Sequence, residues 1–421
     1  MKLMWLCNLA PGAVREQISG KKSSGLWMAH VLTDLRAQKD LKLHILCPGE
    51  TAEGKLDESC SYGCFTEGLP YKYLPELEER FRRELIEFAP DCIHIWGTEY
   101  GHTLAMVNAA EKEGFLSRVV ISIQGLCSVY APHYAEGVPF RVQHRETFRD
   151  AVRKDNIEMQ QKKFALRGEL EIKALEKVRH VIGRTDWDRA CTYAVNPNAA
   201  YHFCNETLRE EFYDGCWDYA SCQKHRIFAS SCAYPIKGFH YLLSAFRRIK
   251  QDYPDATLAV PGDSPVAATF SKKLRQSSYQ RYLVHLMEGL EDSVEFLGSL
   301  SSREMKEQYL RANVFALPST IENSPNSLGE AMLLGVPCVA ADVGGVSNMM
   351  RSGTEGYVYQ SSAPYMLAHY IREVFEGETL AQNMGSLARD HARKTHDPET
   401  NLRDLLEDDR DDGWHHKGAY G

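Results

Sequence analysis

Short apolar segments alternate with longer amphipathic segments along most of the chain. In the first half, the apolar runs are bounded by polar residues, and the stretches between them place apolar residues at helical spacing. This alternation is typical of a parallel sheet with helices on both faces. The predicted strands are Lys2–Cys7, Lys42–Cys47, Asp91–Trp96, Arg118–Ile123 and Val178–Ile182, and the clearest helices are Leu26–Leu35 and Leu74–Phe88.

The second half repeats this pattern, which predicts a second domain of the same class. Residues 205–223 contain no clear strand, so we place the domain boundary there and expect domains over residues 1–205 and 206–394. A helix over about 395–408 is expected to pack back on the first domain, and residues 409–421 read as an acidic, flexible tail. The predicted strands are Arg226–Ser230, Thr257–Val260, Val294–Phe296, Val314–Leu317 and Val336–Ala340, and the helices are Phe239–Asp252, Ala267–Leu290, Arg303–Leu310 and Ser327–Leu334.

Length, composition and charge narrow the class of protein. The 421 residues suit two domains, and 43% hydrophobic with 25% charged residues is typical of a soluble globular protein. A net charge of −8 argues against nucleic acid as a partner. Because the sequence has no long uninterrupted apolar window and its first apolar run is too short for a signal segment, we expect a cytoplasmic protein without a spanning helix.

The strongest chemical signal is the stretch from Pro318 to Met332, PSTIENSPNSLGEAM, which carries Glu322 and Glu330. A strand and a loop precede it, and a helix is expected to begin near Asn326 or Ser327. In a doubly wound sheet, ligands bind beyond the carboxyl ends of the strands, and the first N–H groups of a helix bind phosphate well. Carboxylates accept hydrogen bonds from sugar hydroxyls, so the pattern suits a sugar and a ribose around one diphosphate.

This stretch resembles the paired-glutamate motif of retaining glycosyltransferase family 4, also called glycosyltransferase group 1. The resemblance implies the GT-B fold, an α/β architecture of two Rossmann-like doubly wound parallel-sheet domains that face each other across a cleft. It assigns Glu322 to the hydroxyls of the donor sugar and Glu330 to the ribose. Where the family carries a glycine-rich turn, this chain has Asn323-Ser324-Pro325-Asn326. Since proline has no N–H, we expect Asn326 and Ser327 to bind the phosphates.

Other donor-side residues follow from the same resemblance. Lys237 and Gly238 open a helix after a strand, and a lysine there can neutralise a departing diphosphate. The family pairs this lysine with an arginine five residues earlier, where this chain has Cys232. Backbone groups near Leu297 and Gly298 are expected to hold the nucleobase. In the small-residue loop after the first strand, Gly25 is expected to lie against the donor phosphates.

The acceptor side is less regular. Gln124 ends a strand where the family often carries a histidine near the reacting sugar. Glutamine can hydrogen-bond a sugar hydroxyl but does not titrate, so no acid–base role is available there. His133, nine residues further along, and Glu99, at the end of another strand, are further acceptor-side candidates.

Residues 141–167 are locally basic. Arg141, Arg145, Arg149 and Arg153 recur every four residues, which on one helix would form a single positive face. Such a face could meet an anionic lipid surface or a phosphorylated acceptor. An ordinary solvated face, with interleaved acidic residues, is an equal alternative.

The resemblance implies transfer of a hexosyl unit from a nucleotide diphosphate sugar to an acceptor hydroxyl, with retention at the anomeric carbon. The acceptor is expected to be a glycan or a lipid-linked molecule in polysaccharide or cell-surface glycan assembly, with peripheral contact at the inner face of the membrane as a further expectation. No metal and no cofactor beyond the sugar donor are expected. Cys232 and Gln124 keep open a non-catalytic relative that binds nucleotide sugar or glycan, and a nucleotide-sugar epimerase of the same architecture is another alternative.

Overall fold

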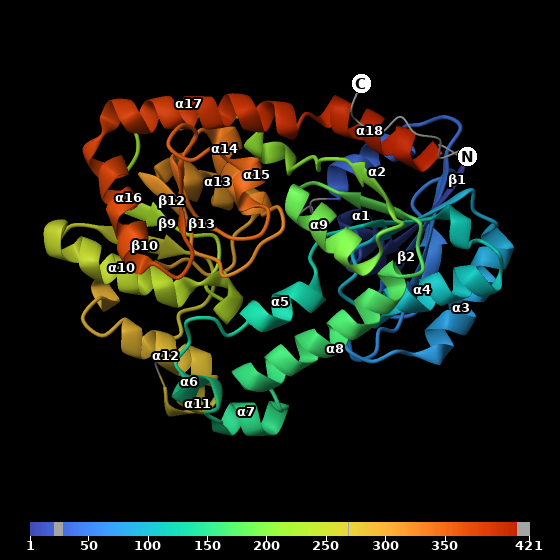
Figure 1. The fold of residues 1–421 in the computed structure, drawn as a ribbon, viewed down its shortest axis with the longest axis horizontal. Helices are drawn as coiled ribbons and strands as arrows, with labels where there is room; N and C mark the ends of the chain where they lie inside the picture. Colours follow the sequence, from blue (N-terminus) through green and yellow to red (C-terminus); the bar gives the residue numbers. More distant parts are fainter. Residues whose placement is uncertain (21–27, 268, 411–421) are drawn as a thin grey trace. The chain divides into compact units, whose positions relative to one another are not determined.

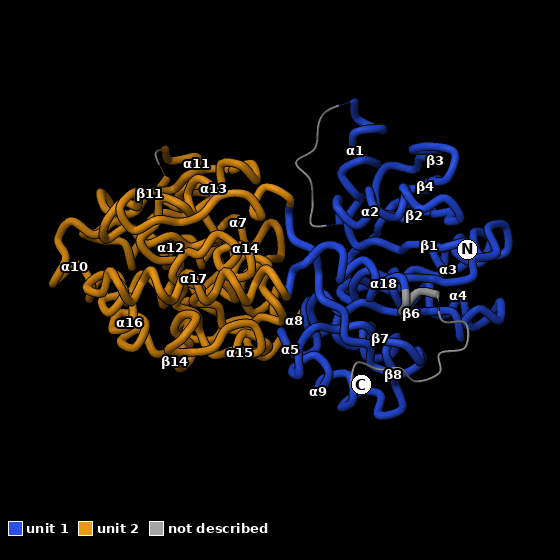
Figure 2. The backbone as a smooth tube through the Cα atoms, turned by 90° about the horizontal axis from the view of Figure 1, so that it is seen from above, with its two compact units in different colours: residues 1–130, 163–209, 395–421 blue, residues 131–162, 210–394 orange. Residues whose placement is uncertain are grey.

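The computed structural model describes residues 1–20, 28–267 and 269–410. The chain forms two compact units, one of residues 1–130, 163–209 and 395 onward, and one of residues 131–162 and 210–394 (Figure 2). The sequence analysis placed residues 131–162 with the first domain. Their packing places them in unit 2, because helices within this segment dock on unit 2.

Unit 1 is built on an eight-stranded sheet in the order β3-β4-β2-β1-β5-β6-β7-β8 (Figure 1). The β3–β4 pair is antiparallel, and the other strand pairs are parallel. All five predicted strands are present. The short strands β3, β4 and β8 were not predicted, because their sequences are polar or interrupted by small residues. The strands are β1 (Lys2–Cys7), β2 (Lys42–Pro48), β3 (Glu53–Lys55), β4 (Cys60–Phe65), β5 (Cys92–Trp96), β6 (Val119–Ser122), β7 (His180–Gly183) and β8 (Ala200–Phe203).

Helices cover both faces of this sheet, because successive apolar side chains of β1 point to opposite faces and all need to be buried. Met4 and Leu6 enter one core cluster, whereas Leu3, Trp5 and Cys7 enter the other. Helix α18 packs on the second cluster through its leucines. The helices of unit 1 are α1 (Gly12–Ser19), α2 (Ala29–Arg36), α3 (Pro75–Phe88), α4 (Gly101–Lys112), α9 (Asp186–Val195) and α18 (Pro398–Arg410), while α5 (Cys127–His133) and α8 (Ile157–Leu175) run from one unit into the other.

Unit 2 has a six-stranded, fully parallel sheet in the order β11-β10-β9-β12-β13-β14. Its first three strands extend from β9 in one direction, and its last three extend from β12 in the other. The change of direction between β9 and β12 makes this point the topological switch of the sheet. The strands are β9 (Arg226–Phe228), β10 (Thr257–Val260), β11 (Val294–Phe296), β12 (Val314–Leu317), β13 (Cys338–Asp342) and β14 (Tyr357–Gln360).

Helices also cover both faces of the sheet in unit 2, where α10 packs against α16 and α13 against α14 (Figure 1). The predicted helix over 267–290 is two helices, because Ser277 starts α12 with a capping box. The helices are α6 (Phe140–Gln143), α7 (Phe148–Arg153), α10 (Phe239–Asp252), α11 (Phe270–Leu274), α12 (Ser278–Leu286), α13 (Ser302–Arg311), α14 (Asn326–Leu334), α15 (Val346–Met349), α16 (Pro364–Glu376) and α17 (Glu378–Thr395).

The predicted single face of four arginines is wrong. Arg141 lies on α6, Arg149 and Arg153 lie on α7, and Arg145 lies between the two helices. A new helix starts at Phe148 because the Thr147 side chain and Asp150 form a capping box, which interrupts the four-residue spacing. Within the described part of the chain, no helix is both long enough and apolar enough to cross a membrane.

Candidate functional site

The loop between β12 and α14 carries the paired glutamates. Helix α14 begins at Asn326, as predicted, and Pro325 precedes it. Among the described residues no side chain caps this helix start, so its first N–H groups point out of the helix without a cap. A helix start of this kind at the end of a central strand is suited to an anion.

Glu322 is held in this loop by two donors. Its Oε1 accepts hydrogen bonds from Ser319 Oγ and from Lys237 Nζ, each at 2.7 Å. The residue is only 7% exposed. Lys237 follows β9 and Glu322 follows β12, so the ion pair bridges the two sides of the switch point of unit 2. The structure therefore brings together the two residues that the sequence analysis assigned to catalysis.

The main chain around this pair is tightly confined. Gly238 has φ +64°, and a Cβ there would lie 1.8 Å from the carbonyl oxygen of Pro318. Gly344, after β13, has φ +53°, and a Cβ there would lie 1.7 Å from the carbonyl oxygen of Glu322. The N–H of Gly345 donates to the same carbonyl at 3.2 Å. Both turns need glycine because the backbone is left-handed there and another backbone segment lies in contact.

Cys232 occupies the position where the related family has an arginine. Its side chain is buried and its Sγ donates to the carbonyl oxygen of Pro261 at 3.6 Å. Burial raises the pKa of this thiol to about 11, so it is neutral at physiological pH. The position thus contributes a small uncharged group that packs on the end of β10.

The other described donor-side candidates also belong to unit 2. Glu330 is on α14 and is 3% exposed, and Tyr309 Oη donates to the carbonyl oxygen of Ser327 at 3.0 Å. The N–H groups of Leu297 and Gly298 donate to the carbonyl oxygens of Val260 and Gly262, at 3.0 and 3.1 Å. These two N–H groups are therefore engaged by the sheet, and a base held here would meet the remaining backbone groups of the turn. Gly25 lies outside the described residues.

The acceptor-side candidates are divided between the units. His133 belongs to unit 2, where its carbonyl oxygen accepts from Thr320 Oγ1 at 3.0 Å and its ring lies 2.9 Å from Glu136. Gln124 and Glu99 belong to unit 1. Gln124 Nε2 donates to Glu206 Oε1 at 2.6 Å, in a pocket that is also lined by Trp96, Arg184, Asn401 and Leu405.

Glu99 lies at the switch point of unit 1, between the ends of β1 and β5. Its Oε2 accepts a hydrogen bond from Asn8 Nδ2, and Asn8 Oδ1 lies 2.9 Å from His102 Nε2. Burial raises the pKa of Glu99 to about 7, and the negative charge of Glu171 acts in the same direction. Glu99 is therefore a titratable carboxyl at the position where a doubly wound sheet binds ligands.

A pH-dependent stability difference is expected for Glu99→Gln. The carboxyl pKa rises from 4.5 to about 7 on folding, so the folded state binds the proton more tightly. The Glu99 carboxyl therefore makes its whole contribution to the free energy of unfolding below pH 4.5, and this contribution is lost as the pH rises to about 7. Glutamine does not titrate, so the variant should gain about 2–3 kcal/mol relative to wild type between pH 5 and pH 8. Urea unfolding at both pH values measures this gain. The exposed Glu50→Gln should show none, and an equal gain in both variants would contradict the assignment.

The sequence analysis missed several members of these sites. Ser319, which holds Glu322, and Asn8, which holds Glu99, both come within two residues of the end of a strand, and that position was the available signal. The Glu206 partner of Gln124 gave no comparable signal, because it lies in a segment without clear secondary structure. In the described ranges, no group of three or more His, Cys, Asp or Glu side chains is placed to hold a metal ion.

Comparison with known proteins identifies the domain that contains the Lys237–Glu322 pair. Residues 223–391 match the family model described as glycosyl transferases group 1. The chain carries a group 1 glycosyltransferase domain. Glu322, Glu330 and Lys237 all lie inside the matched range of this domain, whereas the three acceptor-side candidates precede it.

Curated relatives match the chain over part of its length. The putative glycosyltransferase YtcC of Bacillus subtilis is 29% identical over 159 residues, which are 37% of this chain and 38% of the relative. N-acetyl-alpha-D-glucosaminyl L-malate synthase of Bacillus anthracis is 28% identical over 155 residues, or 37% of each chain. The chain thus spans little more than a third of the length of the curated relatives it matches.

Solved structures resemble the chain over nearly its whole length. Sucrose-phosphate synthase from Thermosynechococcus elongatus gives a TM-score of 0.70 at 15% identity, covering 97% of this chain and 98% of its own. Anabaena HepE in complex with UDP and glucose gives 0.67 at 17% identity, with the same coverage. The group 1 domain is therefore one of the two domains of a GT-B fold, as the sequence predicted.

Proposed function

We propose that the protein is a retaining glycosyltransferase that moves a hexosyl unit from a nucleotide diphosphate sugar to an acceptor hydroxyl. The observation that carries this proposal is the Lys237–Glu322 pair at the switch point of unit 2, beside the uncapped start of α14. This arrangement puts a cation and a helix dipole where a diphosphate would lie, with a carboxylate next to them. The matched relatives include N-acetyl-alpha-D-glucosaminyl L-malate synthase, and HepE was solved with UDP-glucose.

The proposed roles rest on the family resemblance together with the positions of these residues in unit 2. The diphosphate lies at Asn326 and Ser327, with Glu330 on the ribose and Glu322 on hydroxyls of the donor sugar. Lys237 has three N–H donors, so its ammonium can keep its bond to Glu322 and still reach a phosphate oxygen. The bond between the anomeric carbon and the phosphate oxygen breaks, and a bond to the acceptor oxygen forms on the same face. The acceptor proton passes to the departing phosphate, so catalysis consists of positioning and charge stabilisation.

The test is a donor screen followed by a transfer assay. Thermal shifts with UDP, GDP, ADP and their glucose derivatives should single out one base, because only a ligand of the native state stabilises it. Transfer to glycan and lipid-linked acceptors should then give a product with the anomeric configuration of the donor, measured by NMR. We propose that Lys237 and α14 replace a divalent metal, so EDTA should leave the rate unchanged. An inverted product, or conversion of the donor without any acceptor, would contradict the proposal.

A second candidate function rests on Cys232 and Gln124. The first places a neutral buried thiol where the family has an arginine, and the second is already bonded to Glu206. Both observations favour a relative that binds nucleotide sugar without transferring it. Tight binding of one nucleotide sugar in calorimetry, with no turnover on any acceptor, would decide for this candidate.

For an active enzyme, we propose that the acceptor is a polysaccharide or another cell-surface glycan and that the transfer takes place in the cytoplasm.

A further inference from the structure

One end of unit 2 presents large apolar side chains to solvent. Phe140, Phe148 and Phe270 are 71%, 66% and 77% exposed, and Val152 is 69% exposed. Each phenylalanine is the first residue of a helix, namely α6, α7 and α11. These helices gather with α12 at one end of the unit, at the bottom of Figure 1. We call this set of four side chains, with the cations beside them, the aromatic end.

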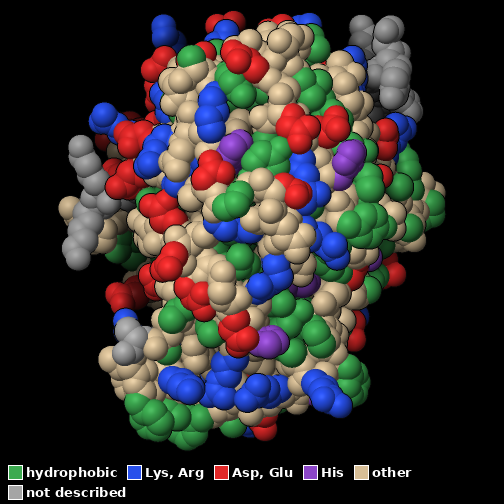
Figure 3. All heavy atoms as spheres, turned by 90° about the vertical axis from the view of Figure 1, so that its left-hand side faces the viewer, with side chains coloured by type: hydrophobic (Ala, Val, Ile, Leu, Met, Phe, Trp, Pro, Cys, Tyr) green, Lys and Arg blue, Asp and Glu red, His purple; other side chains and the backbone are tan. Residues whose placement is uncertain are grey.

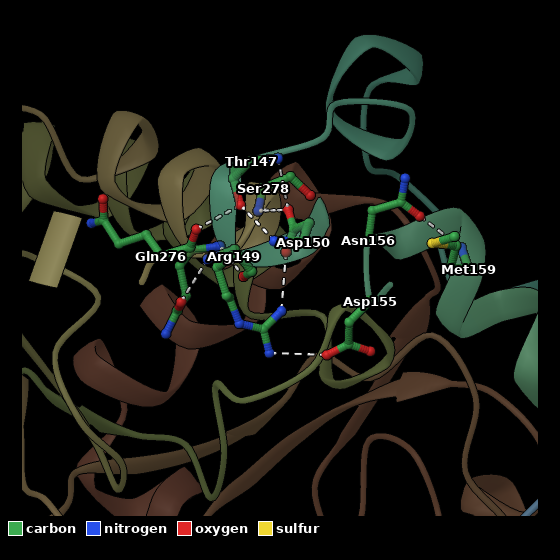
Figure 4. Close-up of polar contacts among 10 residues, drawn as sticks. Thr147, Arg149, Asp150, Asp155, Asn156, Met159, Gln276 and Ser278 are labelled. Atoms are coloured by element: carbon green, nitrogen blue, oxygen red, sulfur yellow. Dashed lines mark hydrogen bonds and ion pairs between the residues drawn. The ribbon is translucent and has the colours of Figure 1, made fainter. Parts of the chain in front are cut away.

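Buried polar contacts fix the helices of the aromatic end to one another. Thr147 Oγ1 donates to the carbonyl oxygen of Gln276 at 2.9 Å, and the fully buried Asp150 accepts from the N–H of Ser278 at 2.9 Å (Figure 4). These bonds join α7 to the turn between α11 and α12, and α6 packs against α12. Because Thr147 and Asp150 close the capping box, Phe148 directly after Thr147 is held in an outward position.

Positive side chains surround these apolar residues. Figure 3 shows a row of Lys and Arg side chains across the lower end of unit 2, with hydrophobic side chains beneath it. Among the ion pairs of the described residues, none involves the exposed cations that belong to the aromatic end. These cations are Arg141, Arg145, Arg153, Lys272, Lys273 and Arg275.

The acidic residues of the same segment are largely neutralised by ion pairs. Asp150 and Asp155 both pair with Arg149 at 3.0 Å, and Glu158 pairs with Lys162 at 2.7 Å. Glu146 remains as an exposed acid between α6 and α7. The aromatic end is therefore net positive although the whole chain carries −8.

We propose that the aromatic end binds the surface of an anionic lipid bilayer. Phenylalanines at separate helix starts protrude singly beside exposed cations, which suits insertion between lipid headgroups. The flanking cations meet the negative charge of the lipid phosphates. The four-arginine helix face expected from the sequence does not exist, and the lipid contact instead combines two segments about 120 residues apart in the chain. This inference does not depend on the proposed transferase activity.

The experiment is co-sedimentation of the full chain with vesicles of phosphatidylcholine alone and of phosphatidylcholine mixed with phosphatidylglycerol. Binding is expected only to the mixed vesicles. The charge variant Arg153→Glu/Lys272→Glu/Lys273→Glu and the apolar variant Phe140→Ala/Phe148→Ala/Phe270→Ala should each lower the partition coefficient by about tenfold or more. Phe148→Trp should give an indole emission that brominated phospholipids quench beyond the wild-type level.

Matched controls in unit 2 lie away from the aromatic end. Tyr365→Ala/Leu387→Ala removes side chains that are 55% and 46% exposed on α16 and α17, and Arg303→Glu reverses a side chain that is 86% exposed on α13. Both should bind mixed vesicles like wild type. Thermal unfolding of every variant detects a folding defect, and nucleotide binding detects a failure of the proposed donor site. A variant that passes both tests and binds vesicles weakly has lost the lipid contact.

Three results would overturn the proposal. The first is wild-type binding to neither kind of vesicle, and the second is equal binding by the charge variant and wild type. The third is an unchanged partition coefficient for the apolar variant, since this would show attraction by charge without insertion. Retention of RNA or of an acidic protein by a chain that ignores vesicles would assign the aromatic end to that partner instead.

Discussion

Replacing Lys237 by alanine is expected to lower the rate of sugar transfer by about 10²–10³-fold, the usual effect of removing one group that stabilises developing charge. Lys237 Nζ lies 2.7 Å from Glu322 at the switch point of unit 2, so its removal takes away the fixed cation of the proposed diphosphate site. Glu322→Gln should lower the rate similarly, because it removes the charged acceptor for the sugar hydroxyls. Initial rates at saturating donor measure both effects, and thermal unfolding should show folded proteins.

The loss of transfer rate should depend on which lysine is replaced, and not on the removal of any lysine from unit 2. Lys306 on α13 of the same unit pairs with the exposed Asp214 at 3.6 Å, so Lys306→Ala removes a lysine from a different ion pair and should keep the wild-type rate. Lys237→Arg should recover part of the activity because it keeps the charge. A Lys237→Ala enzyme with nearly full rate would show that the site is assigned to the wrong residues.

Replacing Gly344 by alanine should destabilise unit 2 by about 2–4 kcal/mol, combining the left-handed backbone with overpacking. The residue has φ +53°, and the added Cβ would lie 1.7 Å from the carbonyl oxygen of Glu322. Relief of this overlap requires the backbone of Gly344 or of Glu322 to shift, and we expect the shift to disturb the bonds of Glu322 to Lys237 and Ser319. Donor affinity should therefore fall together with the free energy of unfolding, and urea unfolding and calorimetry measure the two effects.

Gly353 offers a matched control for this substitution. It has φ +79°, and a Cβ there meets no atom within 4 Å. Gly353→Ala should cost only about 1–2 kcal/mol, the penalty of the left-handed conformation alone, and should leave donor binding unchanged. Equal losses of stability in Gly344→Ala and Gly353→Ala would mean that contact with the Glu322 backbone has no energetic role.

The contacts around Glu322 have a consequence for substrate binding at the proposed donor site. Glu322 is held by Ser319 and Lys237 before any donor arrives, and the two glycine turns keep the surrounding backbone in place. Little reorganisation is then needed when a diphosphate binds, and preorganisation of this kind is a main source of catalytic charge stabilisation. Because Cys232 supplies no cation, the proposed diphosphate site depends more strongly on Lys237 and on the start of α14.

Much of the proposed donor site could be predicted from the sequence because its parts lie close together along the chain. Each strand of the second half is a short apolar run, and the polar residues that follow it fall at the same edge of the parallel sheet. The spacing of Glu322, Pro325 and Glu330 along one loop and one helix was enough to predict the start of α14 and the position of the carboxylates. Chain continuity alone places these groups, so no distant contact was needed to predict them.

Other features depend on contacts between segments far apart in the chain, and only the tertiary structure decided them. The four-residue spacing of the arginines indicated one helix, but the buried bond from Asp150 to Ser278 and the cap at Thr147 produced two. The same contacts moved residues 131–162 into unit 2. Burial beside Glu171, which raises the pKa of Glu99, and the pairing of Lys237 with Glu322 likewise required folding. Periodicity thus determined the strands, helices and sheet edge of this protein, whereas desolvation and long-range packing determined which side chains are charged, paired or exposed.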